Sequence, residues 1–434
     1  MLSGQESIAS LILLGGFLGL LLIRVPISFA LAISALTSAF YLKAPVLVIA
    51  QKMSDGMDTF TLMAIPFFVL AGEIMARGGM ARRLIDFARI LVGWLPGGLA
   101  VVNVVSCMLF GGISGSSVAD ASAIGSILIP AMKERGYARG YATGLTITAS
   151  IQGLIAPTSH NAIIYALATG GAVSVAHIYV AGLIPLGMTC LILSGVALII
   201  AKLRRYPKEP VRSLKDALRI SYQAVLALVS PGIIVGGIVF GFFTPTEASA
   251  VAVLWGFICT FFIYREVGFR AYPEIVLKSV RVTAMVLFLI ASASAFGYML
   301  AIVELPKTIA SALLNITANK YLMLLLLNVI LLFLGMIMDM APLILITTPI
   351  FLPLVKGLGI SPVHFGVIML INLGIGLLTP PVGSTLYVGC SLSGAKIEEL
   401  VKSILPFYGV MFLILMLVSY LPFLTLWLVK VFFG

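Results

Sequence analysis

Charged residues are scarce in this sequence of 434 residues. Asp, Glu, Lys and Arg together make up only 10% of it, whereas an ordinary soluble domain carries about 25%. Hydrophobic residues make up 61%, and the mean hydropathy is +1.17. These values exclude a soluble enzyme and predict about ten to twelve membrane crossings of roughly 20 residues each. The expected fold class is therefore an all-α polytopic membrane protein.

Cysteine and histidine are also rare. The four cysteines stand apart in apolar stretches with no pair at redox or metal spacing, and the three histidines are scattered. No Walker A pattern is present, so the sequence predicts neither an enzyme nor an ATPase. The 27 Lys and Arg lie in small clusters between apolar spans, which is typical of cytoplasmic loops and argues against nucleic-acid binding.

Glycine and proline, in contrast, are abundant, with 42 and 21 residues. Two apolar stretches, 98–130 and 321–355, carry polar residues at their centres, and each predicts a re-entrant hairpin of two half-length helices. The other apolar runs predict membrane spans at 8–23, 26–42, 60–76, 140–172, 178–201, 221–241, 246–263, 282–303, 361–395 and 404–429.

The distribution of positive charge predicts the orientation. The loop from Lys202 to Arg219 contains seven Lys and Arg, which places it in the cytoplasm. Alternating from that loop places the basic segments 77–89, 133–139, 265–281 and 396–402 on the same side. Both termini then lie on the periplasmic or extracellular side.

An internal repeat divides the chain into residues 1–220 and 221–434. At an offset of 223 residues the two halves share glycines, prolines and a lysine across the hairpin and the following span, including Gly112/Gly335, Pro130/Pro353, Lys133/Lys356, Gly153/Gly376 and Pro157/Pro380. Five predicted spans precede the second repeat, and an odd number inverts it. Inverted-topology repeats with paired broken elements are typical of secondary transporters.

Prolines predict a break in each span that follows a hairpin, within 140–172 and 361–395, because proline removes a backbone donor and clashes with the preceding turn. Each break should face its own hairpin tip and expose oxygen atoms there, which suits Na⁺. The alternative is close helix packing through small polar residues. The two predicted Na⁺ sites comprise Ser114, Gly115, Ser116, Ser159 and Asn161 in the first repeat, and Asp339, Gly383, Ser384 and Thr385 in the second.

Asp120 and Asp339 are the only acidic residues in the two apolar hairpins. An ionised Asp at the centre of a membrane helix costs about 2.5–3.5 kcal/mol, so a functional role is expected. For Asp120 the alternative is a cap on the half-helix that begins at the tip. His160 lies within the first break, where it contacts substrate or ion or is a satisfied structural residue. The candidate substrate-binding residues are Ser116, Asp120, Ser159 and His160.

Four long motifs resemble the large membrane subunit of tripartite ATP-independent periplasmic (TRAP) transporters. They lie at Pro66–Met75, Gly111–Asp120, Phe243–Ala248 and Gly376–Gly383, and the resemblance covers nearly the whole chain. It implies an elevator-type carrier of the ion-transporter superfamily, in which both hairpins move against a scaffold of spans 8–42 and 221–263.

The resemblance also implies a function and partners. These are Na⁺-driven uptake of an organic acid, such as a C4-dicarboxylate or sialic acid, through the inner membrane of a bacterium. The expected partners are a small four-helix (Q-type) membrane subunit and a periplasmic (P-type) substrate-binding protein. The alternative is a stand-alone Na⁺- or H⁺-coupled carboxylate carrier of the same superfamily.

Overall fold

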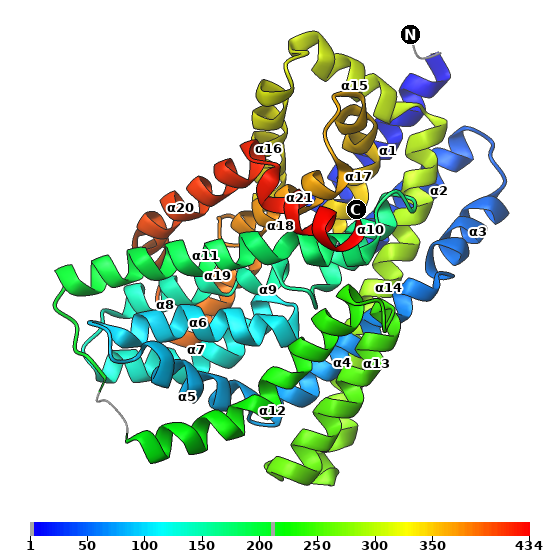
Figure 1. Ribbon diagram of the computed structural model, residues 1–434. Helices are drawn as coiled ribbons and strands as arrows, with labels where there is room; N and C mark the ends of the chain where they lie inside the picture. Colours follow the sequence, from blue (N-terminus) through cyan, green and yellow to red (C-terminus); the bar gives the residue numbers. More distant parts are fainter. Residues whose placement is uncertain (1–3, 210–212) are drawn as a thin grey trace.

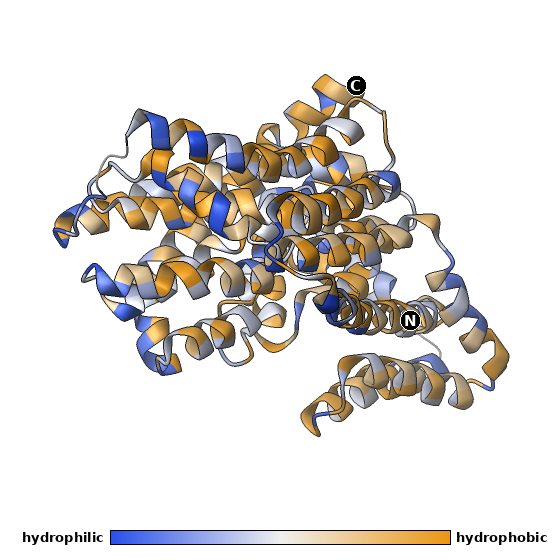
Figure 2. Cartoon of the chain, turned by 90° about the horizontal axis from the view of Figure 1, so that it is seen from below, coloured by the Kyte–Doolittle hydropathy of each residue, from blue (hydrophilic) through white to orange (hydrophobic). Residues whose placement is uncertain are grey.

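The computed structural model describes residues 4–209 and 213–434, and these residues form helices and no strands (Figure 1). Within them, nine helical segments are long and apolar enough to cross a membrane. Large apolar side chains such as Leu11, Leu22 and Phe242 are exposed on the outside, and apolar residues dominate the long helices in Figure 2. An apolar exterior suits hydrocarbon, and the chain is a polytopic membrane protein.

The first half of the chain begins with a series of opening helices and continues into a hairpin. The opening helices are α1 (Gly4–Leu22), α2 (Ile27–Tyr41), α3 (Val46–Met57), the 3₁₀ turn η1 (Phe60–Met63), α4 (Ala64–Arg77) and α5 (Met80–Val92). The first hairpin consists of α6 (Gly98–Ser114) and α7 (Ser117–Glu134). The broken span and the closing helix are α8 (Arg139–Ala149), α9 (Gln152–Ile155), α10 (His160–Ala168) and α11 (Val175–Leu203).

The second half repeats this order. Its opening helices are α12 (Leu214–Val239), α13 (Pro245–Phe257), the π-helix η2 (Ile258–Tyr264), the 3₁₀ turn η3 (Phe269–Ala271), α14 (Tyr272–Ile302) and α15 (Leu305–Ile316). The second hairpin consists of α16 (Lys320–Ile337) and α17 (Met340–Gly357). The broken span and the last helices are α18 (Pro362–Gly376), α19 (Ser384–Ser393), α20 (Ile397–Tyr420) and α21 (Phe423–Phe433).

The helix boundaries confirm the repeat. Helices α7 and α17 coincide at both ends when the chain is shifted by 223 residues. The same shift superimposes α6 on α16 and α5 on α15, and it aligns the two breaks. Both predicted hairpins and both predicted broken spans are therefore present.

Helix α20 shows that the two hairpins enter from opposite ends of the molecule. Near its start, Glu399 pairs at 2.6 Å with Arg139, which follows the base of the first hairpin. At its end, the Tyr420 hydroxyl donates to the carbonyl of Tyr321, at the base of the second hairpin. The 24 residues of α20 span about 36 Å at 1.5 Å per residue. The repeats are therefore inverted.

Ion pairs join the predicted cytoplasmic segments in two groups. Segments 77–89 and 265–281 are joined by two pairs of 2.7 Å, and segment 133–139 is joined to 202–219 at 3.5 Å and to 396–402 at 2.6 Å. These pairs are Arg77–Glu274, Arg83–Glu266, Arg135–Glu209 and Arg139–Glu399. Arg212 of the basic loop lies outside the described residues. The grouping agrees with the orientation predicted from charge.

Glu73 and Arg77, one turn apart on α4, each form an ion pair with α14. Glu73 lies one turn before Arg77 on α4, but its carboxylate pairs with Lys278 of α14 at 2.8 Å. Arg77 instead pairs with Glu274, one turn earlier on α14. Two ion pairs between α4 and α14 thus replace one pair within α4.

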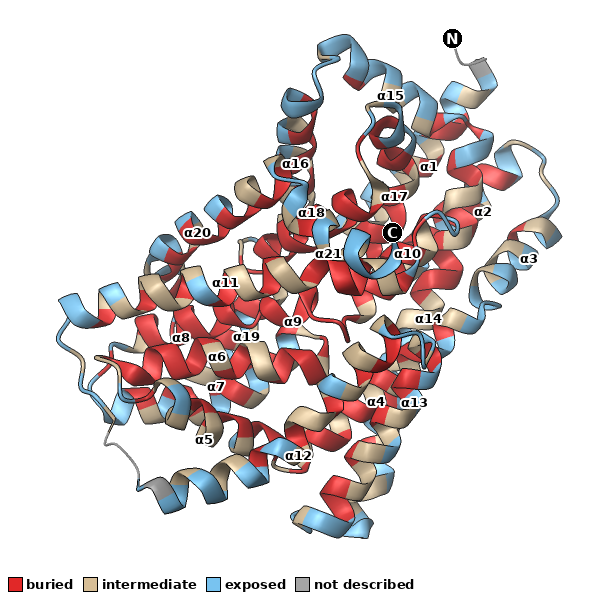
Figure 3. Ribbon diagram, viewed as in Figure 1, coloured by how far each residue is buried: buried red, intermediate tan, exposed pale blue. Residues whose placement is uncertain are grey.

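The opening helices of the two repeats pack together along one side of the molecule (Figure 1). Phe17 of α1 and Phe29 of α2 contact Phe296 and Phe288 of α14, with ring centroids 5.5 and 5.0 Å apart. The broken spans lie deeper, as the red ribbon of α8, α9 and α18 in Figure 3 shows, and every residue of α18 from Val363 to Gly376 is buried. Residues 156–159 of the first break are buried, so protein shields their backbone groups from lipid, whereas Pro381 and Val382 of the second break are exposed.

Candidate functional site

Four helices begin at the two tips and the two breaks. Ser116 is the N-cap of α7, and its side chain accepts from the amide of Ala119. Asp339 is the N-cap of α17 and accepts from the amide of Met340 at 2.9 Å. Helices α10 and α19 begin directly after the breaks, at His160 and Ser384. The start of a helix carries partial positive charge and free amide donors, so this arrangement favours an anion nearby.

Each break packs against the tip of its own hairpin. In the first repeat, the Thr158 hydroxyl donates to the carbonyl of Gly111 at 3.0 Å. Gly115, at the tip, has a φ of +62° and lies so close to the break that a Cβ there would be 2.2 Å from the Thr158 carbonyl oxygen. In the second repeat, the amide of Val382 donates to the carbonyl of Met336 at 3.1 Å. Tip and break are thus in contact in both repeats, as the sequence predicts.

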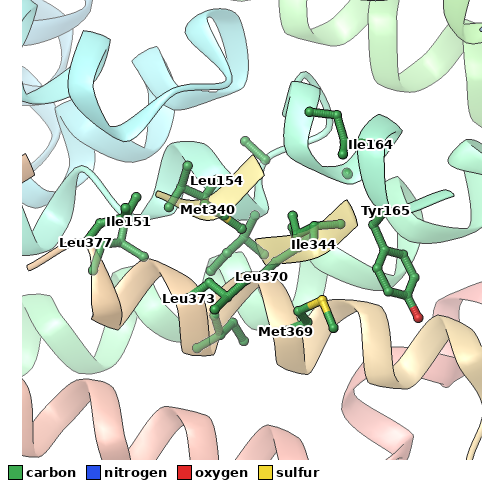
Figure 4. Close-up of a cluster of buried hydrophobic side chains, with 14 of the residues drawn as sticks. Ile151, Leu154, Ile164, Tyr165, Met340, Ile344, Met369, Leu370, Leu373 and Leu377 are labelled. Atoms are coloured by element: carbon green, nitrogen blue, oxygen red, sulfur yellow. The ribbon is translucent and has the colours of Figure 1, made fainter. Parts of the chain in front are cut away.

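The half-helix after each break crosses to the hairpin of the other repeat. The Thr385 hydroxyl of α19 hydrogen-bonds to Ser117 of α7 at 3.0 Å, and Ser117 also bonds to Ser150 at 2.9 Å. The reciprocal contact is between α10 and α17, and Figure 4 shows Ile164 and Tyr165 of α10 in one apolar cluster with Ile344 of α17. Thr385, which the sequence groups with Asp339, therefore contacts the first hairpin tip, so residues from both repeats meet at one centre.

A cavity of about 470 Å³ lies between this centre and the helices α2 and α14. The wall formed by α2 and α14 is apolar except for Ser28. Asp339 is the one charged residue in the lining that the described part of the chain provides. The hairpin and break residues in the wall are Ser116, Ser117, Val118, Leu154, His160, Asn161, Asp339, Met340, Ala341, Pro342, Leu377 and Ser384.

The predicted site residues divide into two groups. Ser116, His160, Asn161, Asp339 and Ser384 line the cavity. The other predicted residues lie behind the wall, where they are buried, or half-buried in the case of Ser114; they are Ser114, Gly115, Asp120, Ser159, Gly383 and Thr385. Asp120 and Ser159 were predicted to bind substrate, but both are completely buried, at 0% exposure, and neither lines the cavity.

Four buried oxygen atoms at the tips and breaks have no hydrogen-bond partner among the described residues. They belong to Asp120 (Oδ2), Ser159 (Oγ), Asn161 (Oδ1) and Ser384 (Oγ). A buried oxygen without a partner costs about 1–3 kcal/mol. Hard cations such as Na⁺ are bound by oxygen ligands of these types, so the residues present fit a cation at this centre.

Sequence reasoning missed Ser117 and the wall of the cavity that α2 and α14 form. Ser117 is 1% exposed and joins the first tip to both broken spans. Its place beside the N-cap of a half-helix was the available signal. The wall from α2 and α14 includes Phe29, Met285 and Phe288. Apolar residues in apolar spans give no sign of which face meets a cavity.

Comparisons with known proteins agree with this architecture. Residues 14–424 match the family model of the tripartite ATP-independent periplasmic transporter, DctM component. The chain is 43% identical over 97% of its length to an uncharacterized protein, YgiK, of Salmonella typhimurium, and covers 97% of that protein. It is 39% identical over 89% of its length to the C4-dicarboxylate TRAP transporter large permease protein DctM of Pseudomonas aeruginosa, and covers 90% of it.

Two further matches concern a longer protein and a solved structure. The chain is 38% identical over 95% of its length to the isethionate TRAP transporter permease protein DctMQ of Oleidesulfovibrio alaskensis, and covers 65% of that protein. The YdaH transporter of Alcanivorax borkumensis has the same fold, with a TM-score of 0.62 at 15% identity over 91% of this chain and 89% of that one. By the family match and these identities, the chain belongs to the DctM family, the large permease components of tripartite ATP-independent periplasmic transporters.

Proposed function

We propose that this permease imports an organic acid and that a Na⁺ gradient supplies the energy for import. The observation that carries the proposal is the cavity at which four helix starts and several unpartnered oxygen atoms meet. Members of this family are transporter permeases of the bacterial inner membrane and not enzymes. Two relatives are named for transport of C4-dicarboxylates and isethionate, both of which are organic anions. An organic anion is therefore the substrate class we propose.

The substrate would lie in the cavity with its anionic group at the helix starts. Ser116 and His160 line the cavity beside the starts of α7 and α10, which supports direct contact with substrate. No Lys or Arg of the described residues lines it. Amide groups, hydroxyls and the positive ends of the half-helices would therefore take the place of a cationic side chain.

Na⁺ would be held by the residues behind and within the cavity wall. In the first repeat these are Ser114, Gly115, Ser116, Ser159 and Asn161, and in the second Asp339, Gly383 and Ser384. Thr385 belongs by position to the second site, but its hydroxyl contacts Ser117 of the first tip. When bound, the cation supplies positive charge next to the substrate anion, so that each favours binding of the other.

Transport would require both hairpins to move together against the scaffold helices. Val118 of α7 is 39% exposed and lines the cavity, so a cysteine there reports access from water. In a background without the four native cysteines, we expect Val118→Cys to react with a thiol reagent at least about threefold more slowly when Na⁺ and substrate-loaded binding protein are present.

Ser126→Cys is the matched control for this measurement. Ser126 is exposed on the same helix but does not line the cavity. Its labelling rate should be the same in all conditions. Labelling rates that do not depend on the ligands at either position would argue for a static pore.

We further propose that the permease works with a periplasmic substrate-binding protein and a small four-helix membrane subunit. The relative named DctMQ, longer than this chain, supports the second partner. The docking surface would include the segments 43–59, 242–247 and 304–320. The segments 43–59 and 242–247 lie near each other, because the Thr246 hydroxyl donates at 3.2 Å to the carbonyl of Phe60, the residue directly after the first segment.

Reversing two exposed charges on this surface should slow encounter with the binding protein. Asp58 and Lys307 are exposed. For Asp58→Lys combined with Lys307→Glu, we expect uptake at limiting binding protein to fall about three- to tenfold at low ionic strength and to recover with added choline chloride, because salt screens such charges. The Na⁺ dependence should not change. Uptake that needs no soluble protein would contradict the docking model and favour a stand-alone carrier.

A further inference from the structure

Asp120 is a buried carboxylate with no cationic partner. It is 0% exposed on α7, one turn after the first hairpin tip. No Lys, Arg or His forms an ion pair with it among the described residues. One of its oxygen atoms, Oδ1, accepts from the Ser114 hydroxyl, and the other, Oδ2, has no partner. An unpaired buried charge is strongly destabilising, so this carboxylate calls for a compensating group.

A capping role does not account for it. The N-cap of α7 is Ser116, whose side chain accepts from the amide of Ala119. The amide of Asp120 donates to the carbonyl of Ser116 at 2.9 Å, as expected inside a helix. The Asp120 side chain accepts no backbone amide. The carboxylate therefore serves something other than the start of α7.

Glycines keep a space for the free oxygen against the broken span. A Cβ on Gly153 of α9 would lie 2.4 Å from Asp120 Oδ2, and a Cβ on Gly111 of α6 would lie 2.9 Å from it. Any side chain at either position would displace the carboxylate. The position of Oδ2 between hairpin and break thus depends on two residues without side chains.

The second repeat lacks both parts of this arrangement. The shift of 223 residues places Leu343 opposite Asp120 and Leu334 opposite Gly111, while Gly376 matches Gly153. Leu343 is 1% exposed. Carboxylate and glycine have thus both been replaced by leucine, which leaves neither the charge nor the space.

We infer that the Asp120 carboxylate is a ligand of the coupling cation in the first repeat, which makes that site formally negative and leaves the matching position of the second repeat neutral. The inference rests on the proposed Na⁺ coupling. The unpartnered Ser159 hydroxyl lies on the break, next to the residue that Gly115 of the tip contacts. A proton would neutralise Asp120 alone, whereas one cation takes several oxygen ligands and satisfies Ser159 as well.

This assignment changes the role of Asp120 from substrate contact to ion binding. Because the carboxylate lies behind the cavity wall, it acts on the substrate through the cation and not directly. Loss of its charge should therefore weaken Na⁺ binding even when no substrate is present.

The test is Na⁺-dependent thermal stabilisation of the purified full-length permease, with K⁺ keeping the ionic strength constant and no substrate added. Asp120→Asn keeps an acceptor for Ser114 but removes the charge. We expect it to raise the Na⁺ concentration for half-maximal stabilisation at least about tenfold, in the range seen when support of a metal site is lost. An unchanged half-maximal concentration in Asp120→Asn would overturn the assignment.

Ser159→Ala and Ser106→Ala provide a second, matched pair. Each removes a completely buried hydroxyl that has no partner, so neither should impair folding. Only Ser159 is at the break. We expect Ser159→Ala to raise the half-maximal Na⁺ concentration about threefold or more and Ser106→Ala to leave it unchanged. Equal responses of the pair would contradict the site, whereas a wild-type protein that Na⁺ does not stabilise would contradict Na⁺ coupling itself.

Discussion

Substrate accumulation in proteoliposomes should fall to the background level when K⁺ replaces external Na⁺ at a fixed membrane potential. The predicted sites offer hydroxyl, carbonyl and carboxylate oxygen atoms from both hairpins, and the described chain carries no run of buried carboxylates such as a proton relay requires. If two ions enter with each substrate, a tenfold Na⁺ gradient concentrates the substrate about 100-fold, since each tenfold gradient supplies about 1.4 kcal/mol per ion.

The measurement requires the complete system, with the small membrane subunit and the loaded binding protein supplied. A Na⁺ gradient imposed in the outward direction is the control, because it should drive substrate out of preloaded vesicles. Equal accumulation in K⁺ and Na⁺ would contradict the proposal. Accumulation that follows an imposed pH gradient would instead favour a H⁺-coupled carrier.

Most of the architecture was predictable because particular residue types, proline and glycine, occur at the breaks and hairpin tips. Proline and glycine mark where a helix cannot continue, and the shared offset then fixes both hairpins, so that α7 and α17 agree at each end. The predicted span 404–429 is one exception. It consists of α20 and α21, which separate at Leu421 and Pro422, and a single proline in an apolar run did not indicate a helix end.

Three helices, α3, α5 and α15, lie outside the predicted spans and hairpins. Helix α5 carries Arg82, Arg83 and Arg89, and these charges mark it as a loop when apolar runs are cut at charged residues. Its buried residues, such as Leu84 and Ile85, recur on one face instead. Helix α15 occupies the same place in the second repeat. Periodicity identifies such helices where average hydropathy fails.

The sequence predicted which residues belong to the site, but not which of them contact one another. The oxygen-bearing residues at the tips and breaks were evident from their positions beside glycine and proline. The crossing of Thr385 to Ser117 was not, because it depends on how the two repeats pack together. The burial of Asp120 behind the wall depends on the same packing. Tertiary contacts of this kind leave no local pattern in the sequence.

The second large effect is expected for Gly115→Ala, which should disrupt the contact between the first hairpin tip and its break. Gly115 has a φ of +62°, and a Cβ there would lie 2.2 Å from the Thr158 carbonyl oxygen and 3.0 Å from the Cα of Ser159. These are backbone atoms that cannot rotate away, so the first tip must separate from its break. Because the proposed cation site is formed by both, we expect Na⁺-driven uptake to fall to background.

Gly136→Ala separates this effect from backbone strain. Gly136 also has a positive φ, of +81°, but a Cβ there meets no atom within 4 Å. An alanine at either position pays about 1–2 kcal/mol for the left-handed conformation. Only at Gly115 does it also push two segments apart. We therefore expect Gly136→Ala to lower the melting temperature slightly and to keep most of the uptake, with protein amounts in the vesicles matched for both variants. Similar uptake by the two variants would mean that close contact between tip and break is not required for transport.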